Sequence, residues 1–368
     1  MKISKVIVDI IERDTGPLNV KDERSDIGGK TTQGVLRLIT DNGIEGNSFL
    51  GSSKLGSEHH HKGIIDFTKK LLIGRNPQNI SKIWNDLWKM NRSLSINAIA
   101  SLDIALWDIN GKISNQPIHR LLGTCKEKVP VYSSTAFHEK INDYVKEAIT
   151  FMEAGWTAHK IHPHGIPDID IKICQEIRKS VGSKMKLMLD SMCAYQYEDA
   201  LRVGKEIEDL NFYWYEDPLV EEDIYNYIKL CSKLEIPIVS TEFIPGKYYS
   251  VPEWVTKKTT NIVRGDVVAM GGITPLKKLT ALADAFNMKC EIHSGSSNSL
   301  DNVANLHVIM ASTNCEFYEF FPCSGENRFG LSKEIEFDNG YVSAPNKPGL
   351  GFEIAWKDLN KTYVATIE

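Results

Sequence analysis

Short apolar runs recur from the middle of the chain onward at a nearly constant interval, and each run ends in a polar residue. The residues that end the runs are Ser133, His162, Asp190, Glu216, Glu242, Asp266, His293 and Glu319. From Asp190 to Glu319, successive end points are 24 to 27 positions apart. This interval has room for one strand, a short loop, a helix of about three turns and a return loop. The pattern therefore predicts a series of strand–helix units.

Helical patterns occupy the intervals between the runs. In 197–210, and again in 274–287, apolar residues recur at three- and four-residue steps, as they do on one face of an amphipathic helix. Parallel strand–helix units build either an open doubly wound sheet or a closed barrel. Eight strand-like runs, none followed by a GxGxxG turn, favour the barrel. We therefore predict an α/β fold with a modified TIM barrel of the (β/α)7β type.

The residues before the barrel do not show the regular interval of strand–helix units. Residues 35–49 predict a hairpin around the turn sequence DNG, and residues 97–112 predict a helix with one apolar face. A second hairpin signal lies in 334–345. We expect an N-terminal α+β capping domain at 1–125 and the barrel at 126–330. A C-terminal segment, 331–368, is expected to return to the cap.

Two polar loops of the cap, 13–30 and 51–62, contain glycine and serine residues. Such loops are typical of the mobile segments that cover an active site. We expect them to cover the barrel mouth and to determine substrate specificity.

The composition is that of an ordinary water-soluble globular chain, with 25% charged and 42% hydrophobic residues. The net charge is −5 and no basic stripe is present, so nucleic acid is not an expected partner. No apolar stretch approaches the ~20 uncharged residues of a membrane-spanning helix, so we expect no membrane partner. The seven cysteines are scattered without a CxxC pair, which predicts reduced thiols in a cytoplasmic protein.

The polar ends of the runs are the strongest functional signal. In a TIM barrel the carboxyl ends of all strands meet on one face, and the active site is built there. Every run from the second to the eighth ends in Asp, Glu or His. A single solvated strand end would be ordinary, but seven in succession are not. The sequence therefore predicts an active site at this face.

Three consecutive runs end in carboxylates, at Asp190, Glu216 and Glu242. Convergent carboxylates in a pocket raise one another's pKa unless a cation lies between them. Ligands that are all oxygens fit Mg²⁺, and Mn²⁺ is also compatible. We therefore expect these residues to bind Mg²⁺. The next residue after Glu216, Asp217, is expected to point to the other face of the strand and to be structural.

The second run carries basic groups. Lys160 and His162 are two residues apart, so both side chains project to the same face of a strand. His164 continues this series, although Pro163 interrupts the strand pattern, and we expect His164 to contribute to substrate binding.

A second candidate for proton transfer lies across the barrel. Asp266 and His293 end the sixth and seventh runs, which are neighbours. A carboxylate beside a histidine fixes its tautomer and makes it a stronger base. A lone histidine at a strand end is more often structural, but this one would face the carboxylate trio. Glu319 ends the last run and is expected to bind a substrate oxygen, or to donate a proton if its pKa is raised.

A cation between two proton-transfer groups suits the removal of a proton next to a carboxylate. The resulting enediolate accumulates negative charge, which a bound cation stabilises. A Schiff-base aldolase would also use a barrel lysine, but it would leave the carboxylate trio unexplained. A non-catalytic binding protein would need neither the lysine nor the histidine.

These residues resemble those of the enolase superfamily, mandelate racemase subgroup, over nearly the whole chain. The segment 97–112 is similar to the family's cap signature, the EDP sequence at 216–218 to its metal site, and 345–351 to its C-terminal segment. The subgroup usually carries Lys-x-Lys on the second strand, whereas this chain has Lys160-Ile161-His162. The resemblance implies that Lys160 helps to neutralise the substrate carboxylate and that His162 occupies the position of the base.

The resemblance implies a dehydratase of a sugar acid, either an aldonate or an aldarate. One base would remove the α-proton, and His293 would protonate the leaving 3-hydroxyl to give a 2-keto-3-deoxy acid. The alternative is a racemase or epimerase of a 2-hydroxy or amino acid derivative, in which His162 and His293 act on opposite faces of one carbon. In either case we expect a small-molecule carboxylate substrate and a homo-oligomer.

Overall fold

The computed structural model describes residues 1–17, 28–50, 63–135, 137–294, 298–321 and 328–368 of the chain. Within these ranges, no helix combines the length and the apolar character that crossing a bilayer requires. Two loops, 13–30 and 51–62, were expected to cover the barrel mouth. Residues 18–27 of the first loop and all of the second lie outside the described residues.

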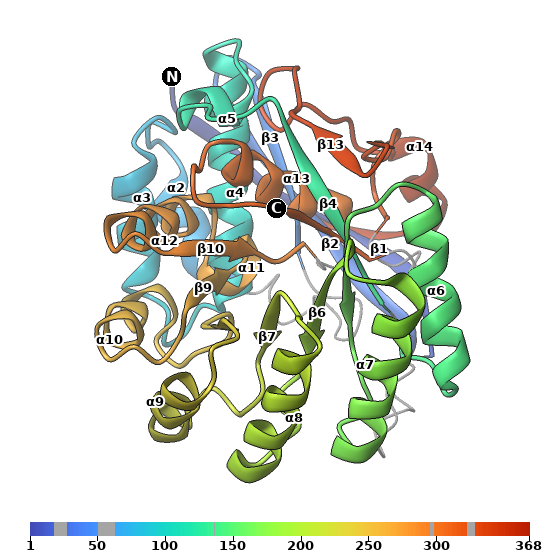
Figure 1. Ribbon diagram of the computed structural model, residues 1–368. Coiled ribbons are helices and arrows are strands. Elements are labelled where there is room, and N and C mark those ends of the chain that lie inside the picture. Colours follow the sequence, from blue (N-terminus) through green and yellow to red (C-terminus); the bar gives the residue numbers. More distant parts are fainter. Residues whose placement is uncertain (18–27, 51–62, 136, 295–297, 322–327) are drawn as a thin grey trace.

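Eight parallel strands form the barrel (Figure 1). They are β4 (Lys128–Ser134), β5 (Ala158–Ile161), β6 (Lys186–Asp190), β7 (Trp214–Glu216), β8 (Ile238–Ser240), β9 (Ile262–Gly265), β10 (Lys289–Ile292) and β11 (Tyr318–Phe320). Each strand from β4 to β9 pairs with the next, and β11 pairs with β4, so the last strand lies beside the first. The predicted parallel barrel is confirmed.

A helix follows each of the first seven barrel strands, as the (β/α)7β pattern requires. These helices are α6 (Ile141–Glu153), α7 (Pro167–Val181), α8 (Tyr197–Asp209), α9 (Ile224–Lys233), α10 (Val251–Thr256), α11 (Val267–Met270), α12 (Ile273–Ala285) and α13 (Ser299–Met310), of which both α11 and α12 follow β9. A short 3₁₀ turn, η2 (Lys247–Tyr249), precedes α10. The predicted helical segment 197–210 coincides with α8 to within one residue at each end. The predicted segment 274–287 corresponds to α12, which begins one residue earlier and ends two residues earlier.

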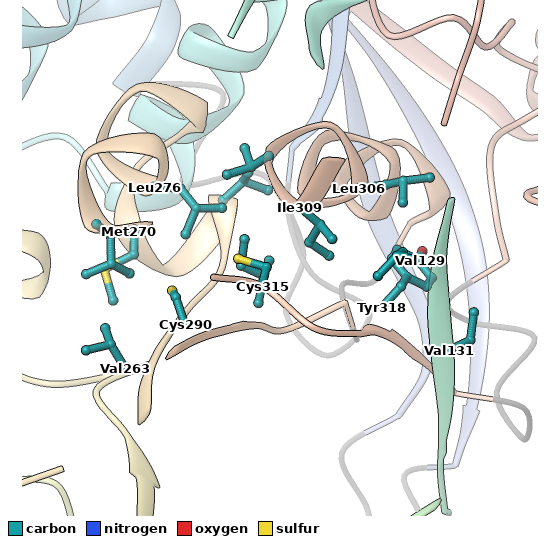
Figure 2. Packing of buried hydrophobic residues seen from close by; sticks show 14 of the residues in the cluster. Val129, Val131, Val263, Met270, Leu276, Cys290, Leu306, Ile309, Cys315 and Tyr318 are labelled. Carbon is teal, nitrogen blue, oxygen red and sulfur yellow. The ribbon is translucent and has the colours of Figure 1, made fainter. Parts of the chain in front are cut away.

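The apolar layer between strands and helices explains why the spacing of the runs determines the fold. Figure 2 shows part of this layer, where Val263 of β9 and Cys290 of β10 lie under Leu276 of α12 and Ile309 of α13. All four side chains are buried. Burying an aliphatic side chain such as Val263, Leu276 or Ile309 contributes about 1.5–3 kcal/mol, so the packing of helices on strands is strongly favoured.

The cap consists of an antiparallel sheet and several helices. The sheet has the order β14-β1-β2-β3, and the predicted hairpin 35–49 forms its β2–β3 edge. The cap elements are β1 (Ile3–Pro17), β2 (Gly28–Thr40), β3 (Glu45–Leu50), the π-helix η1 (Gly63–Thr68), α2 (Lys69–Leu72), α3 (Ile80–Trp88), α4 (Ile96–Ile113) and α5 (Ile118–Leu121). The predicted helix 97–112 is α4, and the hydroxyl of Ser95 caps it by accepting from the N–H of Ala98 at 3.1 Å.

The C-terminal part contacts both the barrel and the cap. It contains β12 (Phe337–Asp338), β13 (Tyr341–Ser343), α14 (Trp356–Leu359), the 3₁₀ turn η3 (Asn360–Thr362) and β14 (Tyr363–Ile367). The strand β13 pairs with β4, and β14 pairs with β1. The domain boundaries at 125 and 330 stay a prediction.

Hydrogen bonds join the cap to the start of α12. The carboxylate of Asp103 in α4 accepts from the N–H of Thr274 at 2.8 Å and from its hydroxyl at 2.7 Å. The indole of Trp84 in α3 donates to the carbonyl of Gly271 at 2.8 Å. A Cβ at Gly272 would lie 2.3 Å from Asp103 Oδ2, so only glycine allows this close approach. The cap helices are therefore fixed beside α11 and α12 (Figure 1).

Candidate active site

The polar residues that end the apolar runs lie at the barrel's carboxyl end. Asp190 and Glu216 are the last residues of β6 and β7, and Glu319 lies within β11. The other strand-end candidates follow their strands by one or two residues, namely His162, Glu242, Asp266 and His293. The predicted strand ends are therefore correct to within two residues.

Lys160 of β5 is completely buried among three carboxylates. Its Nζ lies 2.7 Å from Glu319 Oε1, 2.8 Å from Glu216 Oε1 and 3.4 Å from Asp190 Oδ2. Burial would lower the pKa of Lys160, but these carboxylates raise it above its ordinary value. Lys160 is therefore a charged ammonium that neutralises acids, rather than a free base.

A second buried cation, Arg264 of β9, was not identified from the sequence. Its Nε donates to Glu242 Oε2 at 2.7 Å, and its Nη1 donates to Glu291 Oε1 at 3.2 Å. Its Nη2 lies 3.1 Å both from Glu216 Oε1 and from Glu319 Oε2. One guanidinium thus spans Glu216 and Glu242, two of the three predicted metal ligands.

The carboxylates at the tips of β6 and β7 lie close together. Asp190, Glu216 and Asp217 each offer a ligand oxygen, and these oxygens lie within 4.8 Å of one another. Asp217 was expected to point to the other face of the strand. Its φ of 39° takes the backbone out of strand geometry, so the side chain does not follow the strand's alternation.

Glu242 reaches the same region from the loop after β8. Its Oε2 is held by Arg264, whereas its buried Oε1 makes no hydrogen bond to any residue that the structure describes, although His293 Nδ1 lies 3.2 Å away. An unsatisfied carboxylate oxygen in a buried site is a strong acceptor for a cation.

The charge balance of the site also fits a cation. The buried carboxylates around Lys160 and Arg264 outnumber these two cations; they are Asp190, Glu216, Glu242, Glu291 and Glu319. Burial, and then the neighbouring Asp190, contribute to a pKa of Glu216 well above its ordinary value. Oxygen donors with excess negative charge fit a hard divalent ion such as Mg²⁺.

The contacts of His162 assign a proton to one of its ring nitrogens. Its Nδ1 lies 2.8 Å from the carbonyl oxygen of Thr135, which can only accept, so Nδ1 carries a proton. The backbone N–H of His162 also donates to Thr135 Oγ1 at 2.9 Å. The other ring nitrogen, Nε2, lies 3.0 Å from Asp190 Oδ2. Nε2 is therefore the atom at which His162 exchanges a proton.

His293 and Asp266 are brought together as a pair. His293 Nδ1 lies 3.4 Å from Asp266 Oδ2, which also accepts from Asn305 Nδ2 at 3.2 Å. The N–H groups of Val268 and Ala269 donate to Asp266 Oδ1 at 2.6 and 2.8 Å. These bonds fix the carboxylate and, through it, the imidazole.

The electrostatic surroundings of His293 favour its protonated form. Burial lowers the pKa of this imidazole, but Glu242, Glu319 and Asp266 together raise it to about 9. Glu319 itself has a pKa well below its ordinary value, because Lys160 and Arg264 outweigh the effect of burial. An ionised Glu319 does not donate a proton in this arrangement.

One aromatic ring contacts both histidines. The ring of Phe321 stacks on His162 with a centroid distance of 5.5 Å, and it contacts His293 edge-on with a centroid distance of 6.3 Å. Phe321 therefore connects the two histidines.

His164 is not brought into this cluster. Its backbone N–H donates to Asp170 of α7 at 2.8 Å, and its ring lies 6.0 Å from that of Tyr144 in α6. The contacts described for His164 thus connect it to the outer helices.

Comparison with known proteins identifies the family. Residues 143–358 match the enolase C-terminal domain-like family, and residues 26–123 match the mandelate racemase / muconate lactonizing enzyme N-terminal domain. Arabinonate dehydratase of Saccharolobus solfataricus is 30% identical over 298 residues, which are 78% of this chain and 79% of the relative. D-galactarolactone cycloisomerase of Agrobacterium fabrum is 27% identical over 319 residues, covering 82% and 84%.

A solved structure agrees with this relationship. The magnesium complex of D-glucarate dehydratase from Agrobacterium tumefaciens is 30% identical, with a TM-score of 0.88 over 99% of this chain and 100% of that chain. The named dehydratases among the relatives are carbon–oxygen lyases. The chain belongs to the enolase superfamily, in the mandelate racemase / muconate lactonizing enzyme group.

Proposed function

We propose that this protein is a Mg²⁺-dependent dehydratase of a sugar acid, either an aldonate or an aldarate. The observation that carries the proposal is a buried carboxylate cluster with a histidine on each side. His162 contacts Asp190 at 3.0 Å, and His293 lies 3.2 Å from Glu242. This arrangement provides two proton-transfer groups around one site for a carboxylate substrate.

Asp190, Glu216 and Glu242 would hold the metal. Asp190 lies beside His162 and Glu242 lies beside His293, so a metal held by these residues would lie close to both histidines. Asp217 also offers an oxygen near Asp190 and Glu216. When bound, Mg²⁺ would supply the positive charge that stabilises an enediolate.

The residues of the chain then have separate tasks. Lys160 neutralises part of the negative charge at the substrate carboxylate. Nε2 of His162 would accept the α-proton after it releases the proton that it shares with Asp190, because its other nitrogen is committed to Thr135. His293 donates a proton to the leaving 3-hydroxyl, which departs as water. The enol that remains tautomerises to a 2-keto-3-deoxy acid, so the reaction removes one water molecule from the sugar acid.

The names of the relatives support a sugar acid as substrate. They include an arabinonate dehydratase, an L-talarate/galactarate dehydratase and a D-glucarate dehydratase, at 27 to 30% identity. A racemase or epimerase is the second candidate, because such an enzyme also needs two proton-transfer groups, and His162 and His293 both contact the ring of Phe321. One of the relatives, D-galactarolactone cycloisomerase, is named as an isomerase.

A substrate screen tests the proposal. Mono- and diacid sugars are incubated with the protein and Mg²⁺ in D₂O, and 2-keto acid formation and α-deuterium incorporation are followed together. We expect a 2-keto acid from at least one sugar acid, with activity abolished by EDTA and restored by excess Mg²⁺. Deuterium incorporation with inversion and no 2-keto acid would favour the isomerase. Activity that persists in the metal-free protein would contradict both functions.

A further inference from the structure

A buried acid next to the site has no task in the proposed reaction. Glu221 lies in the loop between β7 and α9, and it is only 6% exposed. Its Oε1 accepts from the backbone N–H of Thr241 at 2.9 Å. Thr241 directly precedes Glu242 in the chain. Glu221 therefore holds the backbone next to a proposed metal ligand.

The backbone at Thr241 needs such support. Its φ is 96°, in the region that favours glycine and that a β-branched residue rarely adopts. This conformation ends β8 after Ser240 and turns the chain toward the site. Without partners that fix it, the backbone at Thr241 would relax toward an ordinary φ, and Glu242 would turn with it.

A second contact of Thr241 connects it to the cation that holds Glu242. The hydroxyl of Thr241 donates to the carbonyl of Arg264 at 2.9 Å and accepts from its N–H at 3.0 Å. The side chain of the same Arg264 donates to Glu242 Oε2 at 2.7 Å. The loop, the neighbouring strand and the carboxylate are thus joined in one closed set of hydrogen bonds.

We propose that Glu221 and Thr241 are positioning residues, which hold Glu242 in the orientation that it needs as a metal ligand. This inference rests on the proposed function, because it assigns Glu242 to the metal. Hydrogen-bond partners that orient metal ligands commonly determine affinity as well as geometry.

Metal binding by the free protein tests the inference without a substrate. Mg²⁺ is titrated calorimetrically into the metal-free wild type and into the variants Glu221→Ala and Glu221→Gln. We expect Glu221→Ala to bind Mg²⁺ about 10–100-fold more weakly, the range for removing a residue that orients a ligand. Glu221→Gln keeps a side-chain oxygen that can accept from Thr241, so it should retain most of the affinity.

Matched controls separate positioning from charge. Glu222 is exposed and adjacent to Glu221, so Glu222→Ala removes the same charge nearby and should leave the affinity unchanged. If Glu221→Ala does not fold by near-ultraviolet circular dichroism, Thr241→Val and Thr241→Ser provide the same comparison, because only serine keeps the hydroxyl. Thr241→Val should then bind Mg²⁺ more weakly than Thr241→Ser.

Three results would overturn the inference. Equal Mg²⁺ affinities of Glu221→Ala and the wild type would show that Glu221 does not support the ligand. Equal weakening in Glu221→Ala and Glu221→Gln would show that charge, not positioning, is responsible. A wild type that binds no divalent ion would refute the proposed function together with this inference, whereas the first two results leave that function intact.

Discussion

Replacing Arg264 by methionine is expected to lower the free energy of unfolding of the metal-free protein by about 3–5 kcal/mol, the usual cost of removing one partner from a buried ion pair. The guanidinium is 1% exposed and contacts four buried carboxylates, those of Glu216, Glu242, Glu291 and Glu319. Methionine fills a similar volume, so the loss reports the unpaired charges rather than a cavity. Urea unfolding followed by far-ultraviolet circular dichroism measures it.

Arg264→Lys is the matched control for this loss. Lysine keeps the positive charge but replaces the planar guanidinium, which carries several N–H donors, by one ammonium group. It should therefore recover part of the stability and leave some of the four carboxylates without a direct contact. A change of less than about 1 kcal/mol in Arg264→Met, typical of an exposed ion pair, would show that Arg264 does not neutralise the carboxylates.

Replacing His293 by asparagine is expected to slow dehydration by about 10²–10⁴-fold, the range for a general acid. Asparagine offers no titratable proton to the leaving hydroxyl. The exchange of the α-proton with D₂O should continue, because Thr135 holds Nδ1 of His162 and leaves Nε2 for that step. Nuclear magnetic resonance of the substrate in D₂O measures exchange and 2-keto acid formation in the same sample.

His162→Asn provides the comparison that assigns the two roles. This variant should lose α-proton exchange and dehydration together, since no later step occurs without the first. If His293→Asn lost exchange while His162→Asn retained it, His293 would be the base and the proposed division of tasks would be wrong.

The barrel and most of its site could be predicted because both follow from periodic patterns. The spacing of the apolar runs reflects the length of one strand–helix unit, and the strand ends of a barrel share one face. Asp190 and Glu216 end their strands at the expected residues. Asp266 and His293 could be paired because β9 and β10 are neighbours.

The remaining features depend on local backbone geometry or on contacts between distant segments. Arg264 lies two residues before Asp266, so the alternation of a strand places both toward the interior, and this signal could have identified it. The orientation of Asp217 and the turn at Thr241 depend on positive φ values at residues that seldom adopt them. Glu221 contacts Thr241 across twenty positions of sequence, which no short-range pattern indicates.

The assignment of the metal ligands is tested most directly by Mg²⁺ titration of two further variants, Glu242→Gln and Asp217→Asn. We predict that the wild type binds one Mg²⁺ ion, that Glu242→Gln loses this binding, and that Asp217→Asn keeps it. Loss of binding in Asp217→Asn with full binding in Glu242→Gln would contradict the assignment and favour the cluster of Asp190, Glu216 and Asp217.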